Sequence, residues 1–452
     1  MNRRPPRTQR QRTLALFKQA DALHQSGNLE AALPIYKRIL RDDPDAWQVT
    51  FRLGLLCWQI RDFDRAIRCL TSVISRKPEF PHAHYNLGVV YEEMGRTMQA
   101  FACYEQAIRL EPTFGDAWEG LGKALHALGN PEDAVRCYEK ALAVSPPSGT
   151  ATAERRYNSS YSLMALGRWT EGWAAYESRF QSPVFMGNYV LRHHEPMWDG
   201  SPLEGRKLLV HAEQGFGDSL MMARWINAID GEVHIEVQEP LVRLFQQSFP
   251  TRTVTAQGKE YPRCDCQVAM MSLAHQFRMS AENVPTAPWL VAGAAPVLPE
   301  GDGLKVGFVW GGSPHHRNDK RRSIPLPMWK PLFQVPNVTW YSLQYDEEPV
   351  SVAAHNLRPL ITDFADTAAL VRQLDLVICV DTSVAHLAGG LGTPCWILLP
   401  TIPDYRWGLT SLDTVWYPTA RLVRQEVQGD WETPMREMAE GLQALTKQLE
   451  AA

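Results

Sequence analysis

The chain has 452 residues, 45% of them hydrophobic, and a formal net charge of −4. This length allows about three domains with cores of their own, and the small negative charge excludes a general electrostatic attraction to nucleic acid or anionic lipid. No run approaches the roughly 18 apolar residues of a membrane-spanning helix, and no signal peptide is recognised. We therefore expect a cytoplasmic protein without a transmembrane segment.

Residues 1–12 contain five arginines and no acidic residue. This composition predicts a disordered basic tail, and the alternative is an arm that binds a partner. Among the eight cysteines, Cys264 and Cys266 form a C-x-C pair. No second pair follows at zinc-binding spacing, so the pattern favours a protein without a bound metal.

Residues 13–146 contain four repeats with a period of 34 residues. An alanine and a proline recur in all four, Gly88 returns as Gly122, and Tyr104 returns as Tyr138. Small residues let paired helices approach, aromatic rings fill the space between them, and proline ends the second helix of each pair. These residues resemble the tetratricopeptide (TPR) repeat, which implies a concave groove that binds polypeptide.

A four-residue insertion after residues 145–152 shifts the phase of the repeats, and a degenerate fifth unit follows. Its aromatic residues Trp169, Trp173 and Tyr176 predict a cap that packs the repeats against the next domain. We therefore expect a repeat domain over residues 13–180 with a protein partner, whose identity the sequence does not give.

From Lys207 onwards, short apolar runs alternate with helical segments, which predicts parallel sheets covered by helices. The first series contains "KLLVHA", "EVHIEVQ" and "RTVTA". The second series follows a linker rich in proline and glycine and contains "KVGFVWGG", "VTWYSLQ", "LDLVICV" and "PCWILLP". The two series predict two Rossmann-like domains, residues 181–296 and 297–452, that face each other across a cleft. In open sheets of this kind, ligands lie beyond the carboxyl ends of the strands.

In the first series, unusual residues follow a strand end. "EQGFGD" joins the first strand to a helix, and its glycines permit a tight turn at a helix N-terminus that can hold an anion. Asp218 falls at the N-cap or in the first turn of that helix. The alternative to a functional role is that Asp218 only caps the helix.

In the second series, "WGGSPHHRNDKRRSIPL" follows a strand, and a basic loop with glycine suits a diphosphate. Its cationic residues are Arg317, Lys320, Arg321, Arg322 and, when protonated, His315 or His316. The alternative is a solvated loop. A later strand ends at Asp381, after which Thr382 and Ser383 open a helix that can direct N–H groups and hydroxyls at phosphate. His386 lies one turn further along, and its alternative role is packing.

Residues 207–440 resemble a glycosyltransferase of the GT-B fold, in the clan of bacterial heptosyltransferases (family 9), which is also related to the O-linked N-acetylglucosamine transferases. The marks of this resemblance are "GFGDSL" and "VDTSVAHLAGGLGTP". Further blocks, among them "GRWTEGWAAYESRF", "VGFVWGGSPHHRNDKRRSIPL", "YRWG" and "WYPTARLVRQ", resemble more closely bacterial TPR-containing glycosyltransferases of the flagellin-modifying type. The series covers nearly the entire chain and implies a TPR α-solenoid followed by a GT-B fold of two Rossmann-like domains.

The resemblance implies a role for each marked position. Asp218 corresponds to the general base that acts on the acceptor hydroxyl. A basic side chain among Lys320, Arg321 and Arg322 corresponds to the one that holds the donor phosphates, and we favour Arg322. The expected donor-binding set is Gln214, Gly217, Trp310, Gly311, Ser313, Lys320, Arg322, Gln344, Asp381, Thr382, Ser383 and His386.

Glycosyl transfer needs a base near the acceptor and fixed hydrogen-bond donors or cations at the leaving phosphate, because negative charge develops there. No D-x-D motif follows a predicted strand, so we expect a metal-independent, inverting transferase without a cofactor. We expect it to use a nucleotide sugar and to modify a Ser or Thr hydroxyl of a protein recruited by the TPR domain, flagellin being one candidate. The alternatives are a heptosyltransferase-like enzyme that acts on lipopolysaccharide or another glycan, and a TPR adaptor without activity. The motifs identify neither the sugar nor the nucleotide.

Overall fold

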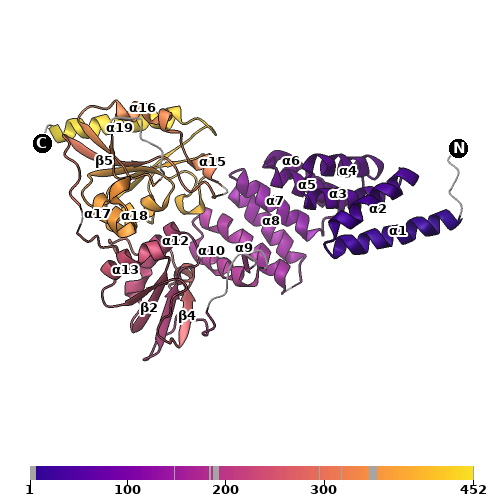
Figure 1. Cartoon of the computed structure of the whole chain (residues 1–452), viewed down its shortest axis with the longest axis horizontal. Coiled ribbons are helices and arrows are strands. Elements are labelled where there is room, and N and C mark those ends of the chain that lie inside the picture. Colours follow the sequence, from indigo (N-terminus) through magenta and orange to yellow (C-terminus); the bar gives the residue numbers. More distant parts are fainter. Residues whose placement is uncertain are drawn as a thin grey trace. The chain divides into compact units, whose positions relative to one another are not determined.

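The computed structural model describes residues 7–146, 148–182, 185–186, 193–294, 296–316, 318–345 and 354–450. The chain forms two compact units, Met1–Ser162 and Leu163–Ala452. The first unit is helical, and the second contains two separate sheets (Figure 1). Both Rossmann-like series belong to the second compact unit.

The first unit consists of consecutive helices, and from α1 to α8 each helix contacts the next one. Its helices are α1 (Arg7–Gln25), α2 (Leu29–Asp42), α3 (Trp47–Gln59), α4 (Phe63–Arg76), α5 (Pro81–Glu93), α6 (Thr97–Leu110), α7 (Gly115–Ala127) and α8 (Pro131–Ala143), and α9 (Thr150–Ala165) crosses the boundary. The repeated alanines Ala32, Ala66, Ala100 and Ala134 are all 0% exposed. A Cβ atom on Gly88 would lie 2.7 Å from Cε1 of Tyr104. Small residues therefore let the helices approach and tyrosine fills the space between them, as the period predicts.

The amino-terminal end of α1 corrects one prediction. Residues 7–12 belong to this helix, so the described part of the predicted basic tail is helical rather than disordered, and residues 1–6 lie outside the described residues. No glycine or proline interrupts α1, and arginine, glutamine and leucine are good helix formers. Phe17 and Ala20 anchor the helix by packing into the core of the first repeats.

The predicted fifth unit is divided between the two compact units. Helix α9 has 16 residues, whereas α7 has 13, so the inserted residues lengthen a helix by about one turn. Helix α10 (Trp169–Tyr176) belongs to the second unit, where Trp173 is fully buried and donates from Nε1 to the sulfur of Met279 at 3.1 Å. The ring of Trp169 lies 5.3 Å from that of Trp416. These aromatic residues therefore belong to the core of the second unit.

The first sheet of the second unit has four parallel strands in the order β3-β2-β1-β4. The strands are β1 (Lys207–His211), β2 (Glu232–Val237), β3 (Thr253–Ala256) and β4 (Cys266–Ala269). The helical segments around it are η1 (Glu177–Gln181), α12 (Phe216–Met222), η2 (Ala223–Ala228), η3 (Glu239–Leu241), α13 (Val242–Ser248), η4 (Met270–Ser272) and α14 (Leu273–Gln276). The direction in which strands are added reverses between β1 and β4.

The second sheet has six parallel strands in the order β10-β9-β8-β5-β6-β7. The strands are β5 (Leu304–Val309), β6 (Val338–Ser342), β7 (His355–Asn356), β8 (Leu376–Val380), β9 (Cys395–Leu399) and β10 (Ala420–Arg424). The helical segments are α15 (Asp319–Arg322), η5 (Leu326–Trp329), α16 (Lys330–Phe333), η6 (Arg358–Leu360), α17 (Phe364–Val371), α18 (Ser383–Leu391), η7 (Tyr405–Trp407) and α19 (Glu432–Glu450). This strand order is that of the doubly wound dinucleotide-binding fold, and it reverses between β5 and β8. The prediction of parallel sheets covered by helices is confirmed.

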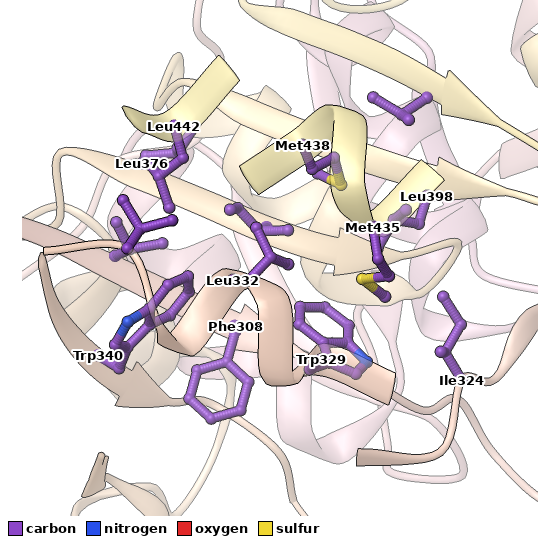
Figure 2. Close-up of a cluster of buried hydrophobic side chains, with 14 of the residues drawn as sticks. Phe308, Ile324, Trp329, Leu332, Trp340, Leu376, Leu398, Met435, Met438 and Leu442 are labelled. Carbon is purple, nitrogen blue, oxygen red and sulfur yellow. The ribbon is translucent and has the colours of Figure 1, made fainter. Parts of the chain in front are cut away.

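One face of the second sheet carries a large apolar core (Figure 2). Helices α16 and α19 cover this face, and α17 and α18 lie on the other one (Figure 1). Phe308 on β5 packs against Trp329 and Trp340, and Met435, Met438 and Leu442 come from α19. This packing fixes β5, the central strand, and therefore the loop that follows it.

Candidate functional site

The two reversal points of the sheets are brought together by helices α12 and α18. Helix α12 follows β1 and α18 follows β8, and the two helices are in contact. A Cβ atom on Gly217 would lie 2.8 Å from Cδ2 of His386 and 3.6 Å from the Cα atom of Ser383. Gly217 therefore lies where the segment after β1 touches the segment after β8, and this close approach explains the glycine without a ligand.

Asp218 caps its helix and also forms an ion pair that the sequence did not predict. Its Oδ2 atom accepts a hydrogen bond from the backbone N–H of Gly215 at 3.0 Å, which caps α12. Its Oδ1 atom forms an ion pair with Arg406. Burial raises the pKa of Asp218 above its ordinary value, and the charge of Arg406 opposes that rise. A carboxylate with a raised pKa is better matched to proton transfer near neutral pH.

Arg406 is the residue that links the two halves of the site, and our sequence analysis assigned it no role. It lies in η7, its side chain is 11% exposed, and it pairs with Asp404 at 2.6 Å as well as with Asp218. The single available signal was the block "YRWG" in the resemblance. An isolated arginine in a loop has no local pattern that reveals an ionic partner far away in the sequence.

Asp381 and Arg322 lie side by side at the carboxyl ends of β8 and β5. Nη1 of Arg322 donates to the backbone carbonyl of Asp381 at 2.8 Å. Burial raises the pKa of Asp381 to about 6, the charge of Asp404 adds to the rise, and Arg322 and Arg406 oppose it. Thr382 caps α18 by accepting a hydrogen bond from the N–H of Val384 at 3.3 Å.

The His386 side chain is buried and lies next to Gly217, the residue before Asp218. It is 5% exposed, its ring stacks on Trp407 with centroids 5.4 Å apart, and Nδ1 lies 2.6 Å from the hydroxyl oxygen of Tyr417. Burial lowers the pKa of His386 well below its ordinary value, and Arg406, Arg224 and Arg322 lower it further. The imidazole is therefore neutral at physiological pH.

The remaining predicted residues divide into those that shape the loop after β5 and those that are exposed. Oε1 of the buried Gln344 accepts hydrogen bonds from the backbone N–H groups of Trp310 and Gly311, each at 3.2 Å, so Gln344 orders this loop. The Trp310 ring packs beside Phe308 on the core. Ser313 is exposed, and its backbone carbonyl accepts a hydrogen bond from the N–H of His316.

Only some of the predicted residues are brought to the strand ends. Lys320 and Arg321 are exposed, Arg322 is largely buried against Asp381, and Arg317 lies outside the described residues. Nε2 of Gln214 donates to the hydroxyl of Tyr176 at 3.4 Å. The structure therefore brings together Gly217, Asp218, Arg322, Asp381, Thr382, Ser383 and His386, with Arg406 added.

The charges at this site limit its chemistry. Arg322 and Arg406 are both already paired with aspartates, and Asp218, Asp381 and Asp404 are close enough for their charges to interact. A diphosphate that binds here must therefore compete with carboxylates for the two guanidinium groups. Within the described residues, no cluster of three or more histidine, cysteine or acidic side chains is arranged to hold a metal ion.

Comparisons with known proteins identify the type of repeat in the first unit. Two tetratricopeptide repeat families match the chain, one at residues 17–67 and 58–97, and the other at residues 81–114 and 115–147. The first unit is a tetratricopeptide repeat domain. None of the described helices is long and apolar enough to cross a membrane.

One bacterial relative is similar to the chain beyond its repeats. Protein FlbA of Caulobacter vibrioides is 32% identical over 320 residues, which cover 62% of this chain and 53% of FlbA. The chain thus spans about half the length of that relative. Because 62% of 452 residues exceeds the 162 residues of the first unit, the similarity extends into the second unit.

Several solved structures are similar to part of the chain. MamA is 20% identical, with 38% of this chain and 97% of MamA covered and a TM-score of 0.33. A thermophilic TPR protein of Thermus thermophilus is 19% identical, with 39% and 96% covered and a TM-score of 0.33. PilF of Pseudomonas aeruginosa is 17% identical, with 37% and 74% covered and a TM-score of 0.34.

Proposed function

We propose that the second unit is a GT-B glycosyltransferase that moves a sugar from a nucleotide sugar to a Ser or Thr hydroxyl of a protein held by the TPR domain. The observation that carries the proposal is the meeting of α12 with α18 beyond the carboxyl ends of two parallel sheets. Ligands of such sheets bind at the points where the strand order reverses. A carboxylate from one sheet and cations from the other thus surround one place, as glycosyl transfer requires.

Asp218 is the proposed general base. The acceptor oxygen forms a bond with the anomeric carbon while the bond from that carbon to the phosphate oxygen breaks. The acceptor proton passes to Asp218, and the electron pair leaves with the phosphate. A single displacement of this kind inverts the anomeric centre and needs no nucleophile from the protein.

Arg322, Arg406 and the first turn of α18 are proposed to stabilise the leaving phosphate. Arg322 approaches from the loop after β5, and Ser383 and the N–H groups of α18 approach from β8. The diphosphate of a nucleotide sugar carries two negative charges and a carboxylate carries one, so the diphosphate can draw Arg406 away from Asp218. Without Arg406, Asp218 is a stronger base at the moment when a base is needed.

The acceptor is proposed from the TPR domain and from the resemblance to flagellin-modifying enzymes. A protein hydroxyl, with flagellin as the first candidate, fits a chain that combines a peptide-binding array with this site. The experiment incubates the full chain with a panel of nucleotide sugars that carry heptose, N-acetylhexosamine, rhamnose or nonulosonic acid. We expect one donor to raise the melting temperature and to release its nucleotide when flagellin is added.

The other outcomes of this experiment distinguish the alternative functions. Turnover with a glycan acceptor and not with protein would favour a heptosyltransferase-like enzyme. If no donor shifts the melting temperature and none releases nucleotide, the transferase proposal fails and the chain is a TPR adaptor. Asp218→Asn in the same assay distinguishes transfer at this site from a contaminating activity.

A further inference from the structure

One ring nitrogen of His386, Nδ1, forms a hydrogen bond with Tyr417, a residue that has no role in the proposed reaction. Nδ1 lies 2.6 Å from the hydroxyl oxygen of Tyr417, and both side chains are buried, His386 at 5% and Tyr417 at 1% exposure. The Tyr417 ring is itself fixed, because a Cβ atom on Gly389 would lie 2.2 Å from its Cδ1 atom. This hydrogen bond is therefore a fixed part of the core beneath the site.

The surroundings of Tyr417 decide which atom carries the proton. The guanidinium carbon of Arg224 lies 5.0 Å from the Tyr417 ring centroid, and arginine supplies only hydrogen-bond donors. Burial raises the pKa of Tyr417, so the hydroxyl keeps its proton. A buried O–H group needs an acceptor, and Nδ1 of His386 is the one within reach. Tyr417 is therefore the donor, and Nδ1 is the acceptor.

The other ring nitrogen is directed at the place where α12 meets α18. A Cβ atom on Gly217 would lie 3.4 Å from Nε2 and 2.8 Å from Cδ2 of His386, so this edge of the ring faces the residue before Asp218. The stack on Trp407, with an interplanar angle of 18°, keeps the ring in that orientation. A neutral histidine whose Nδ1 accepts a hydrogen bond carries its proton on Nε2.

We propose that Tyr417 and Arg224 are positioning residues that hold His386 as the neutral Nε2–H tautomer, so that it donates one hydrogen bond to an oxygen of the sugar-nucleotide donor. The identity of that ligand rests on the proposed function, whereas the tautomer does not. Arg224 keeps its place through Nη1, which donates to the carbonyls of Trp416 and Pro285 at 2.9 and 3.1 Å. A fixed neutral donor stabilises negative charge on an oxygen without any change of its own protonation.

The tautomer can be read from the intact chain. Full-length protein labelled with ¹⁵N-histidine is examined by two-bond ¹H–¹⁵N correlation, and the signals of His386 are assigned by their loss in His386→Gln. We expect a pyridine-type Nδ1 and a pyrrole-type Nε2 across the neutral pH range. A protonated Nδ1, or a charged ring, in the wild-type chain would overturn the inference without any variant or substrate.

Tyr417→Phe tests the cause of the tautomer. Without the phenolic donor, we expect the His386 signals to show both tautomers or the opposite one. The matched control is Tyr341→Phe, which also removes a fully buried hydroxyl, one that donates to the carbonyl of Pro299 at 2.8 Å. The control should leave the His386 signals unchanged. An unchanged tautomer in Tyr417→Phe would refute the role of Tyr417.

The kinetic consequence is measured with the donor that the proposed function identifies. We expect kcat of Tyr417→Phe to fall about tenfold, which corresponds to roughly one hydrogen bond in the transition state, with KM for the acceptor unchanged. If the chain transfers no sugar, the proposed function fails while the spectrum still decides the tautomer. If transfer occurs and Tyr417→Phe keeps full kcat, the positioning role fails while the proposed function stands.

Discussion

Asp218 and Arg406 form an ion pair that makes the proposed base less basic. Oδ1 of Asp218 pairs with Arg406, and Oδ2 accepts a hydrogen bond from the N–H of Gly215. Burial raises the pKa of Asp218 and the charge of Arg406 lowers it, so a donor phosphate that attracts Arg406 would make the carboxylate a stronger base. We therefore expect the donor to bind before the acceptor is deprotonated.

Asp218→Asn is the first test at the residue scale. The amide oxygen can still accept from the N–H of Gly215, so α12 keeps its cap, but the amide cannot take a proton from the acceptor. We expect transfer to fall by roughly 100- to 10,000-fold, while calorimetry still detects donor binding. Asp375→Asn is the control, since this aspartate also accepts a backbone hydrogen bond, from Lys305 at 2.8 Å. Simultaneous loss of transfer and donor binding would contradict the assignment of a base.

Arg322→Ala tests the phosphate contact. Arg322 is the cation of the loop that reaches the carbonyl of Asp381, whereas Lys320 and Arg321 are exposed. Loss of a charged hydrogen bond of about 1.5 to 3 kcal/mol raises the donor Kd by roughly 10- to 150-fold. Calorimetric titration should show a much smaller effect for Lys320→Ala and Arg321→Ala. An unchanged Kd in Arg322→Ala, with a weakened Lys320→Ala or Arg321→Ala, would transfer the role to that neighbour.

The raised pKa of Asp381 predicts a pH-dependent stability. Its pKa rises from 3.8 to about 6 on folding, so the folded chain binds this proton more tightly than the unfolded chain does. The charged carboxylate thus destabilises the fold above about pH 6, and the penalty disappears as the pH falls below the unfolded pKa. We expect Asp381→Asn to stabilise the second unit by about 1 to 3 kcal/mol at about pH 7.5 and by less at about pH 4.5. Denaturant titrations at both pH values test this, and equal shifts at both would contradict it.

At the scale of elements, the periodicity of the sequence predicted the helices and strands that are determined by local sequence. The 34-residue period gave α2 to α8, and the apolar runs gave β1, β2, β3, β5, β6, β8 and β9. Three paired strands were missed: β4 (Cys266–Ala269), β7 (His355–Asn356) and β10 (Ala420–Arg424). β4 has four residues and was considered for a metal, β7 has two residues, and β10 carries charged arginines. They were hidden because such strands are defined by their neighbours in the sheet rather than by their own residues.

Some residues of the site could be predicted from local sequence, and others could not. Residues that follow strand ends, such as Asp218 and Asp381, could be found because the carboxyl ends of parallel strands are recognisable in sequence. Arg406 could not be found from the sequence, because its partner Asp218 is 188 residues away. The packing of Gln344 against the loop after β5 was equally hidden, because an amide after a strand fits a ligand contact and a loop contact alike.

Gly217→Ala tests the contact between α12 and α18. The added methyl group would lie 2.8 Å from Cδ2 of His386, closer than packed atoms allow, so the His386 ring or one of the two helices has to shift. We expect a loss of about 1 to 3 kcal/mol of stability and a loss of transfer, because Asp218 moves with its helix. Gly441→Ala in α19 is the control, since its new methyl group has room at 3.4 Å and alanine favours a helix. A melting curve of Gly217→Ala that matches the wild type would show that the helices are not in close contact.

At the scale of the whole molecule, aromatic residues of the predicted fifth repeat unit pack in the second compact unit. Trp169, Trp173 and Tyr176 continue the pattern of the repeats, yet Trp173 packs on Met279 and Trp169 on Trp416 in the second unit. Repeat spacing tells where a helix begins and ends, but only tertiary contacts tell which core receives it. The proposed chemistry lies within Leu163–Ala452, whereas the proposed recognition of a protein lies within Met1–Ser162.

Deletion of residues 1–146 separates the two proposed tasks. The cut falls between α8, which ends at Ala143, and α9, which begins at Thr150, so it severs no helix. The core of the second sheet and the contacts of Trp173 remain intact, because all of their residues come from the second unit. We expect the shortened chain to release nucleotide slowly from its donor, as the full chain does without an acceptor, and to leave flagellin unmodified.

The control for this deletion keeps the full length of the chain. Gly88→Leu places a large side chain where Tyr104 leaves no room, so it should disrupt the repeats and abolish modification of the acceptor in the same way. Both variants are assayed for nucleotide release and for the mass of the acceptor protein. If either variant modifies flagellin as fast as the full chain does, the TPR groove does not recruit the acceptor, and the second unit alone recognises it.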